Sequence, residues 1–395
     1  EDSKEDYENT HYAELWMGTH PKSPSVVKIT EEVKSLLKNS FYTSHFDEVV
    51  DLNQIIEEHK TTFLNERVCE MNTVEGSGAL PFLFKILSVD TSLSIQAHPH
   101  KSLAEELHLQ YPDIYKDANH KPEMIIALTD YEALCSFSNG NDIYERLNTN
   151  NSLKLFYSQV DLEGLKEEDK VKEVLAQIIK ITFESEDVKI AQVVQDLLED
   201  ITKIDEDDKT AHQILAPRLN IQYENDVGII VSFLLNYLIL KPGQALVLKP
   251  NEPHAYLKGE GLECMATSDN VVRGGLTPKL KHAKVLVDML TYETGDIIPL
   301  NGDSETNTNQ VIYNSGFDEF SVVKVSAQTG QDPTTYVAKD PGILIVINGN
   351  GTVSTNSGES YKINKLDTYY VMPGKELSFT SEGEECDVFI ATLGN

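Results

Sequence analysis

The spacing of apolar residues changes in the middle of the chain, and this change most restricts the possible folds. Between about 141 and 240, KVKEVLAQIIKITFE and IAQVVQDLLEDI place apolar residues at the i, i+3, i+4, i+7 spacing of amphipathic helices. Outside this segment, short apolar runs punctuated by Pro and Gly are typical of strands. A chain of 395 residues also exceeds what one core usually supports.

The sequence therefore predicts a mainly β protein with an α-helical insertion. We expect a discontinuous domain formed by 1–140 and 241–290, a helical domain at 141–240, and a C-terminal domain at 291–395. In the last of these, short strands separated by turns over 320–393 predict a β-sandwich or jelly roll. The polar leader at 1–9 is expected to be disordered.

Composition excludes several classes of partner. The formal charge of −31 and the pI near 4.6, without a basic tract, argue against binding to nucleic acid. The longest apolar run, Val227–Leu240, is shorter than the ~20 residues of a membrane span, and no signal peptide is visible. The four cysteines are far apart and show no CxxC spacing, which favours a reducing, cytoplasmic location.

The stretch LSIQAHPHKSLAEELH at 93–108 carries the first candidate metal ligands. Gln96 and His98 are two residues apart on a strand-like run, so their side chains would point to the same face. After Pro99, a short helix is predicted with Ser102 as N-cap. The alternative is that Gln96 only bonds to the backbone and that His98 is a half-buried loop residue, because short motifs often match by chance.

Two further segments supply candidate ligands. In DANHKPEMIIAL, Pro122 imposes an extended backbone and Glu123 begins a strand, so Glu123 can point inward; a solvated turn is the alternative. In NEPHAYLKGEG, His254 and Tyr256 share a strand face. Two imidazoles, a carboxylate and an amide oxygen suit Zn²⁺ acting as a Lewis acid, although Co²⁺ or Mn²⁺ also fits such a site.

Cations stand near these ligands in an otherwise acidic chain. Lys85 lies in the dense apolar run LPFLFKILSV, where it either extends to the surface or meets an anion. Lys121 precedes Glu123, and Arg273 and Lys279 follow Asp269 in a Gly-rich loop. Such a set attracts an anionic substrate, and a phosphorylated metabolite is the expected one.

Several blocks together resemble type I mannose-6-phosphate isomerase (phosphomannose isomerase) in its eukaryotic-like form. They are YAELWMGTHP, LPFLFKILSVDTSLSIQAHPHKSLAEELH, DANHKPEMIIAL and NEPHAYLKGEGLECMATSDNVVRGGLTPK, and the resemblance covers nearly the whole chain in order. It implies a zinc enzyme of the cupin superfamily, with a double-stranded β-helix catalytic domain, an inserted helical domain and a C-terminal jelly roll. It also implies a link to GDP-mannose biosynthesis, glycosylation or glycolysis.

The resemblance places this sequence's residues in roles. The zinc ligands, for one Zn²⁺ per chain, would be Gln96, His98, Glu123 and His254. The active-site arginine would be Arg273, and the residues lining the same pocket would be Glu14, Lys85, Lys121, Tyr256, Asp269 and Lys279. Ser94 falls where the family holds the substrate phosphate. The family normally begins with a Tyr-x-Trp-Gly strand that contributes to the site, and none precedes Glu1, so we expect the sequence to be truncated there.

Aldose–ketose isomerisation gives these residues tasks. A base must move a proton from C2 to C1 through a cis-enediolate, and Lys121 is the first candidate, because a cation beside zinc and Arg273 is expected to give up its proton readily. His120 and Asp269 are candidates for ring opening. Lys85, Lys279 and Ser94 are assigned to the phosphate end.

Two rival functions belong to other classes. A non-catalytic sugar-phosphate-binding cupin would not need both the ligand set and the SDNVVRGGLTPK loop. A cupin oxygenase would favour a histidine-rich iron site over a glutamine amide. We expect a monomer acting on a small sugar phosphate, without nucleic acid or membrane.

Overall fold

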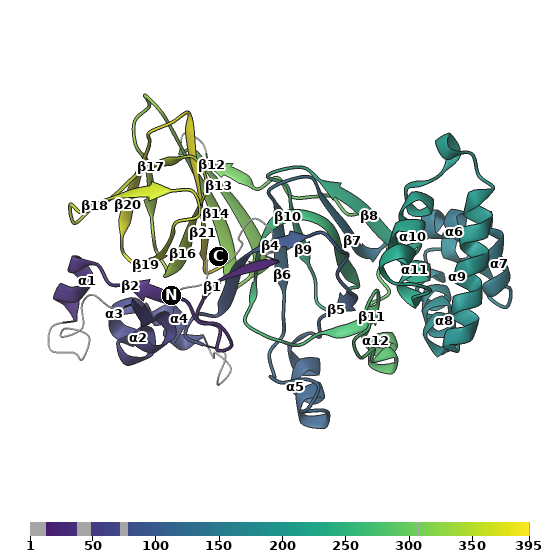
Figure 1. Cartoon of the computed structure of the whole chain (residues 1–395). Coiled ribbons are helices and arrows are strands. Elements are labelled where there is room, and N and C mark those ends of the chain that lie inside the picture. Colours follow the sequence, from purple (N-terminus) through teal and green to yellow (C-terminus); the bar gives the residue numbers. More distant parts are fainter. Residues whose placement is uncertain (1–12, 38–48, 72–77, 306–307, 395) are drawn as a thin grey trace, which may run out of the picture.

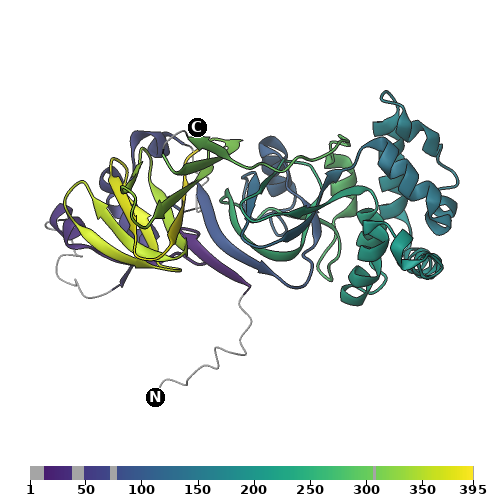
Figure 2. The same cartoon turned by 90° about the horizontal axis from the view of Figure 1, so that it is seen from above.

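The computed structural model describes residues 13–37, 49–71, 78–305 and 308–394. Three parts lie in a row, with a β-sandwich at one end, a central set of strands, and helices at the other end (Figures 1 and 2). The predicted leader at 1–9 lies outside the described residues. Within the described ranges, each helix is too short or too polar to cross a membrane.

The central part is a nine-stranded sheet system in which β10 pairs with four neighbours, β4, β5, β6 and β7. Its strands are β1 (Glu14–Gly18), β4 (Phe82–Val89), β5 (Ile95–Ala97), β6 (Glu123–Ala127), β7 (Tyr131–Phe137), β8 (Leu235–Leu240), β9 (Ala245–Leu248), β10 (His254–Ala266) and β11 (Val272–Gly275).

Strand β10 continues through the GEG sequence at 259–261, although glycine often interrupts a strand. Gly259 has φ +120°, and a Cβ there would lie 2.6 Å from the Asp130 carbonyl oxygen, so only glycine lets the strand pass. A register shift between Tyr256 and Lys258 bends the same region. The first half of β10 therefore pairs with β5 and β7, and the second half pairs with β4 and β6.

The helical end matches the predicted periodicity. Its helices are α6 (Gly140–Thr149), α7 (Asn151–Phe156), α8 (Val171–Glu184), α9 (Asp187–Thr202), α10 (Ala211–Gln222) and α11 (Val227–Ser232), with 3₁₀ turns at Leu162–Lys166 and Glu206–Asp208. In α9 the expected face is buried at Ile190, Val194, Leu197 and Ile201. The apolar run Val227–Leu240 is divided between α11 and β8, because β8 pairs with β7 and so belongs to the central sheet.

The C-terminal end consists of two sheets around a shared core. The strands of the six-stranded sheet are β12 (Asp303–Glu305), β13 (Gln310–Phe317), β14 (Phe320–Gln328), β21 (Glu385–Thr392), β16 (Gly342–Asn348) and β19 (Thr368–Val371). Those of the four-stranded sheet are β15 (Thr334–Val337), β20 (Glu376–Ser381), β17 (Asn350–Thr355) and β18 (Ser360–Asn364). Leu344 of one sheet and Phe379 of the other belong to the same buried cluster, so the chain ends in the predicted β-sandwich.

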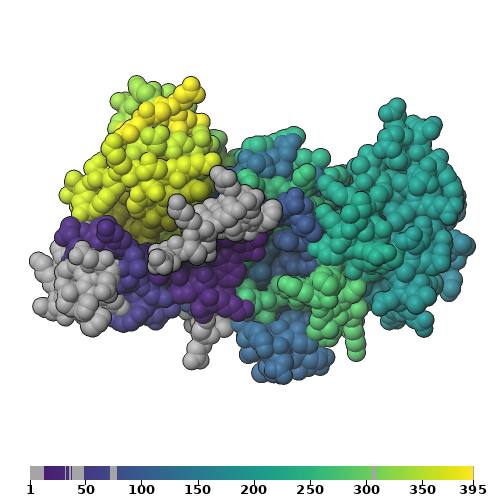
Figure 3. Space-filling model, viewed as in Figure 1, coloured from purple at the N-terminus to yellow at the C-terminus, as the bar shows by residue number. Residues whose placement is uncertain are grey.

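Short elements fill the space below the sandwich (Figure 3). They are α1 (Glu31–Leu36), α2 (Leu52–Glu58), α3 (Lys60–Phe63), α4 (Glu66–Glu70), β2 (Val26–Lys28) and β3 (Val49–Asp51). The alternation of acidic and apolar residues at helical spacing over 29–65 predicts helices there, but β3 makes this segment partly strand, and 38–48 lies outside the described residues.

Two local predictions are wrong. Helix α5 (Lys101–Gln110) is capped by His100, whose Nδ1 accepts from the Leu103 N–H, whereas Ser102 lies inside the helix and bonds to His100. The helix starts two residues earlier than a Ser102 cap would allow, because His100 already has the extended conformation of a cap. Arg273 lies on strand β11, opposite Gln96, and not in a loop. Helix α12 (Ala283–Met289) follows that strand.

Candidate active site

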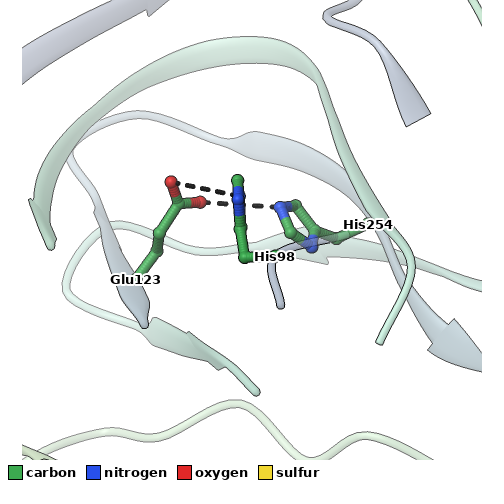
Figure 4. A group of neighbouring side chains, drawn as sticks. All are labelled: His98, Glu123 and His254. Atoms are coloured by element: carbon green, nitrogen blue, oxygen red, sulfur yellow. Dashed lines mark ion pairs between the residues drawn. The ribbon is translucent and has the colours of Figure 1, made fainter. Parts of the chain in front are cut away.

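Three buried side chains converge inside the central strands. His98 follows β5, Glu123 opens β6 and His254 opens β10, and their ligand atoms lie within 4.8 Å of one another (Figure 4). His98 Nε2 is 3.3 Å from Glu123 Oε1, and His254 Nε2 is 3.5 Å from Glu123 Oε2. Across the described residues this is the one group of three or more His, Cys, Asp or Glu side chains with such geometry.

Backbone carbonyls decide which nitrogen of each ring faces the centre. His98 Nδ1 lies 2.7 Å from the Asn270 oxygen, and His254 Nδ1 lies 3.2 Å from the Glu252 oxygen. A carbonyl can only accept, so both Nδ1 atoms carry hydrogen and both Nε2 atoms present lone pairs to the centre. Burial lowers the pKa of His98 to about 4, which keeps this ring neutral near pH 7.

The donor set fits a divalent cation. Glu123 Oε2 and His254 Nε2 are buried without a hydrogen-bond partner, a costly state for lone pairs that a metal ion would relieve. Burial raises the pKa of Glu123, but the lowering of the pKa by the neighbouring His98 and Lys121 is larger. The pKa of this carboxyl group therefore lies well below its ordinary value. Two neutral imidazoles and one carboxylate are typical ligands of zinc with open positions.

Gln96 lies beside this group in a different orientation from the expected one. Its Oε1 accepts a hydrogen bond from Ser94 Oγ at 2.9 Å, while its Nε2 faces His98 Nε2 at 3.5 Å. The amide oxygen would have to exchange places with the nitrogen to become a ligand. Its role as the fourth ligand stays a prediction.

Lys121 and Lys85 have carboxylate partners from the chain itself. Lys121 Nζ lies 3.0 Å from Glu123 Oε1, so it directly adjoins the metal-ligating group. Lys85 is buried, with Nζ 2.7 Å from Glu263 and 3.3 Å from Glu14. Of the two alternatives for Lys85, the structure shows the anion-paired one, and a role at a substrate phosphate stays a prediction.

Glu263 is a site residue that the sequence interpretation missed. It is a buried carboxylate on β10, paired in register with Lys85 on β4. Burial raises its pKa, and the Lys85 charge opposes that rise without reversing it. The available signal was one acidic residue inside the apolar run LECMA, the counterpart of the one lysine in LPFLFKILSV.

The remaining predicted residues are distributed around this centre. Glu14 accepts a hydrogen bond from the Trp16 indole at 2.5 Å on edge strand β1, so these two side chains lie on the same face of the strand. Tyr256 is buried, and burial raises its pKa well above the ordinary value. Lys279 is exposed, and no described contact joins its side chain to the group.

Asp269 and His120 bind neighbours outside the ligand group. Asp269 is 2.6 Å from Lys22 Nζ, in the segment after β1. His120 Nε2 is 2.5 Å from Glu319 Oε1, in the C-terminal sandwich. Both residues therefore connect the site to more distant segments.

Asp117, which had no assigned role, holds the loop before β11. Its Oδ2 accepts the Asp269 N–H at 2.8 Å, and its Oδ1 accepts from Ser268 Oγ at 2.8 Å. Asn270 Nδ2 donates to the Asp117 backbone oxygen at 2.7 Å. Since the Asn270 carbonyl orients His98, the Asp117 carboxylate supports a ligand that it does not touch.

Comparison with known proteins identifies the family. The family model described as phosphomannose isomerase type I, catalytic domain, matches residues 3–139. A probable mannose-6-phosphate isomerase of Dictyostelium discoideum is 37% identical over 397 residues, covering 98% of this chain and 85% of that protein. The chain belongs to the type I phosphomannose isomerase family.

Other relatives in the family agree in sequence and in fold. Mannose-6-phosphate isomerase of Saccharomyces cerevisiae is 34% identical and covers 94% of this chain and 87% of that protein. The crystal structure of mannose 6-phosphate isomerase from Salmonella typhimurium, bound to the substrate fructose 6-phosphate and zinc, has a TM-score of 0.79. It is 25% identical, and the alignment covers 97% of this chain and 91% of that one.

Proposed function

We propose that this chain is a zinc-dependent aldose–ketose isomerase that interconverts mannose 6-phosphate and fructose 6-phosphate. The observation that carries this is the buried group of His98, Glu123 and His254, in which Glu123 Oε2 and His254 Nε2 have no hydrogen-bond partner, next to Lys121 Nζ. Its relatives bear the name of this enzyme, and the Salmonella typhimurium enzyme binds zinc and fructose 6-phosphate.

The residues that would hold zinc are His98 and His254 through Nε2, and Glu123 through its carboxylate, with Gln96 as a fourth after its amide turns. When bound, zinc supplies Lewis-acid stabilisation of negative charge on the substrate oxygens. The buried position of these ligands excludes water from their immediate surroundings.

Side chains around the zinc site supply the proton transfer. Lys121 is the proposed base: as the neutral amine it takes up the C2 proton of the open-chain aldose, and as the resulting ammonium it returns this proton to C1, while a proton passes from the O2 to the O1 oxygen. Arg273 stabilises the charge of the cis-enediolate from strand β11. His120 and Asp269 act in ring opening, and Ser94, Lys279 and Lys85 serve the phosphate end, with Tyr256 and Glu14 lining the pocket.

The finer architecture belongs to the same proposal. We assign the central strands to a cupin double-stranded β-helix formed by 1–140 and 241–290, the helices to a domain at 141–240, and the sandwich to a jelly-roll domain at 291–395. The proposal also includes that the protein is a monomer in the cytoplasm. There it supplies mannose 6-phosphate for GDP-mannose, or feeds mannose into glycolysis.

Conversion of mannose 6-phosphate to fructose 6-phosphate by the purified chain is the test. We expect activity that is lost with chelator and returns with Zn²⁺. A folded, zinc-containing chain that binds the sugar phosphate without converting it would instead favour the non-catalytic binding protein.

A further inference from the structure

The turn between β13 and β14 brings the C-terminal sandwich to the active site. Glu319, in this turn, places Oε1 2.5 Å from His120 Nε2, and the two side chains are only 17% and 14% exposed. The Phe317 ring stands edge-on to the imidazole, with centroids 6.2 Å apart. Glu319 and Phe317, which are distant in the sequence, thus contact His120, the residue that precedes Lys121.

This turn is fixed on its own side. The Gly394 N–H donates to the backbone carbonyl oxygen of Asp318 at 3.0 Å, and Phe317 pairs in register with Phe320. Phe320 is fully buried in a cluster shared with Phe84 of β4 and Met124 of β6. The sandwich and the central strands therefore share a packed frame that includes Phe320, the residue after Glu319. Figures 1 and 2 show these two parts side by side.

The segment that carries His120 is held on its other side as well. Asn119 Nδ2 donates to the Thr267 oxygen at 3.0 Å, and the Ala266 N–H donates to the Pro122 oxygen at 3.1 Å. Glu123 then begins β6. Small changes at His120 are expected to reach Lys121, because both residues belong to this clamped stretch.

The charge of Glu319 decides the tautomer of His120. Burial raises the pKa of Glu319, but the hydrogen bond from His120 lowers it below its ordinary value, so the carboxylate is ionised. An ionised carboxylate only accepts, so His120 Nε2 carries the hydrogen and Nδ1 is left to exchange a proton. A carboxylate on one nitrogen also fixes the orientation of the ring.

We propose that Glu319 is a positioning residue of the active site, which fixes the ring orientation and tautomer of His120 and, through it, the place of Lys121. This role rests on the proposed isomerase function. It gives the C-terminal sandwich a task in catalysis, namely to present one carboxylate to the segment before β6.

Variants of Glu319 in the full-length, zinc-loaded protein test this role. We expect Glu319→Ala to lower kcat by about 10- to 100-fold, with little change in KM and with unchanged zinc content. Glu319→Gln should restore part of kcat, because its amide oxygen still accepts from His120. The matched control is Asp318→Ala, since this exposed side chain lies in the same turn, and it should keep wild-type kcat.

A double-mutant cycle with His120→Ala identifies the route of the effect. If Glu319 acts through His120, Glu319→Ala has no further effect on kcat in the His120→Ala background, and urea unfolding of the same four proteins shows a coupling between the two residues. Equal effects of Glu319→Ala in both backgrounds overturn the role.

Two other results also decide the matter. A kcat within about twofold of wild type for Glu319→Ala would overturn the positioning role, as would an equal loss in Asp318→Ala, because the whole turn would then be responsible. A wild-type chain that does not isomerise would reject the proposed function first, whereas an active wild type with a normal Glu319→Ala variant rejects the positioning role alone.

Discussion

Lys121 carries the most specific chemical role at the residue scale. Its Nζ lies 3.0 Å from Glu123 Oε1 and its side chain is largely buried, so it directly adjoins the metal-ligating group. We expect Lys121→Met to lower kcat by about 10²- to 10⁴-fold, the usual contribution of a positioned general base. Steady-state kinetics and loss of C2 proton exchange with solvent are the measurements.

The control for this variant is Lys116→Met, an exposed lysine five positions earlier. It should leave kcat and zinc content unchanged. Near-normal turnover by a folded, zinc-loaded Lys121→Met protein would assign the base to another group.

Residue types were easier to predict than pairings. The spacing of Gln96 and His98, the strand that opens at Glu123 and the strand of His254 pointed to three segments that the fold does bring together. The contact between Lys85 and Glu263 was not predictable, because it depends on the register of β4 against β10. An apolar run with one charge shows that a partner is needed but not which residue provides it.

At the scale of elements, the loop before β11 links Asp117 to a metal-ligating ring. In Asp117→Asn, the amide –NH₂ must either face the Asp269 N–H or displace the bonds from Ser268 and Asn119. We therefore expect the affinity for zinc to fall by about 10- to 100-fold through the disturbed His98 contact. Competition with a calibrated chelator measures it.

Asp113→Asn serves as the matched control, because Asp113 is exposed four positions earlier. It should bind zinc like the wild type. Wild-type affinity in Asp117→Asn would show that the loop keeps its position without the carboxylate.

Helix α10 contains a buried histidine that makes stability depend on pH. Burial and the nearby positive charge of Arg146 lower the pKa of His212 from 6.5 to about 4, while its ring donates to the Leu235 carbonyl. The unfolded chain therefore binds more protons than the folded chain between these values, and the free energy of unfolding falls as pH drops from about 6.5 to about 4. The loss from this group is on the order of 3 kcal/mol.

His212→Gln isolates this contribution. Glutamine can still donate to the Leu235 carbonyl but takes up no proton, so urea unfolding of the variant should depend less on pH than that of the wild type across the same window. Parallel pH profiles of the two proteins would mean that His212 is not the group responsible.

Element boundaries were predictable only where one pattern extends far enough. The face of α9 follows from its spacing, since four of its apolar residues are buried as expected. The run Val227–Leu240 is apolar throughout, and such a run does not distinguish α11 from β8; pairing with β7 decides it. The cap of α5 was predicted at Ser102 and lies at His100, because serine is a more common N-cap than histidine and the sequence pattern therefore favoured it.

At the scale of the whole molecule, periodicity separates helical from strand-rich segments, but it does not give the contacts between them. Glu319 and His120 are far apart in the sequence and meet only because the sandwich packs on the central strands. Nothing in the pattern around either residue indicates the other.

The buried clusters join all three parts, which predicts how the molecule responds to loss of metal. One cluster contains Val194 of α9 together with Leu257 of β10, and another contains Leu262 of β10 together with Phe389 of β21. Because β10 belongs to both and begins at His254, we expect stabilisation by zinc to reach the whole chain. Free zinc at 1,000 times its dissociation constant would add about 4 kcal/mol.

Calorimetry of the chain with and without chelator tests this expectation. One cooperative transition should move to lower temperature as a unit when zinc is removed, and His254→Ala should show no zinc-dependent shift. Two transitions, of which only one responds to zinc, would mean that the helical end or the sandwich unfolds independently of the strands that carry the site. In that case the packed frame next to Glu319 would unfold without loss of metal, and kcat would fall on heating before zinc is released.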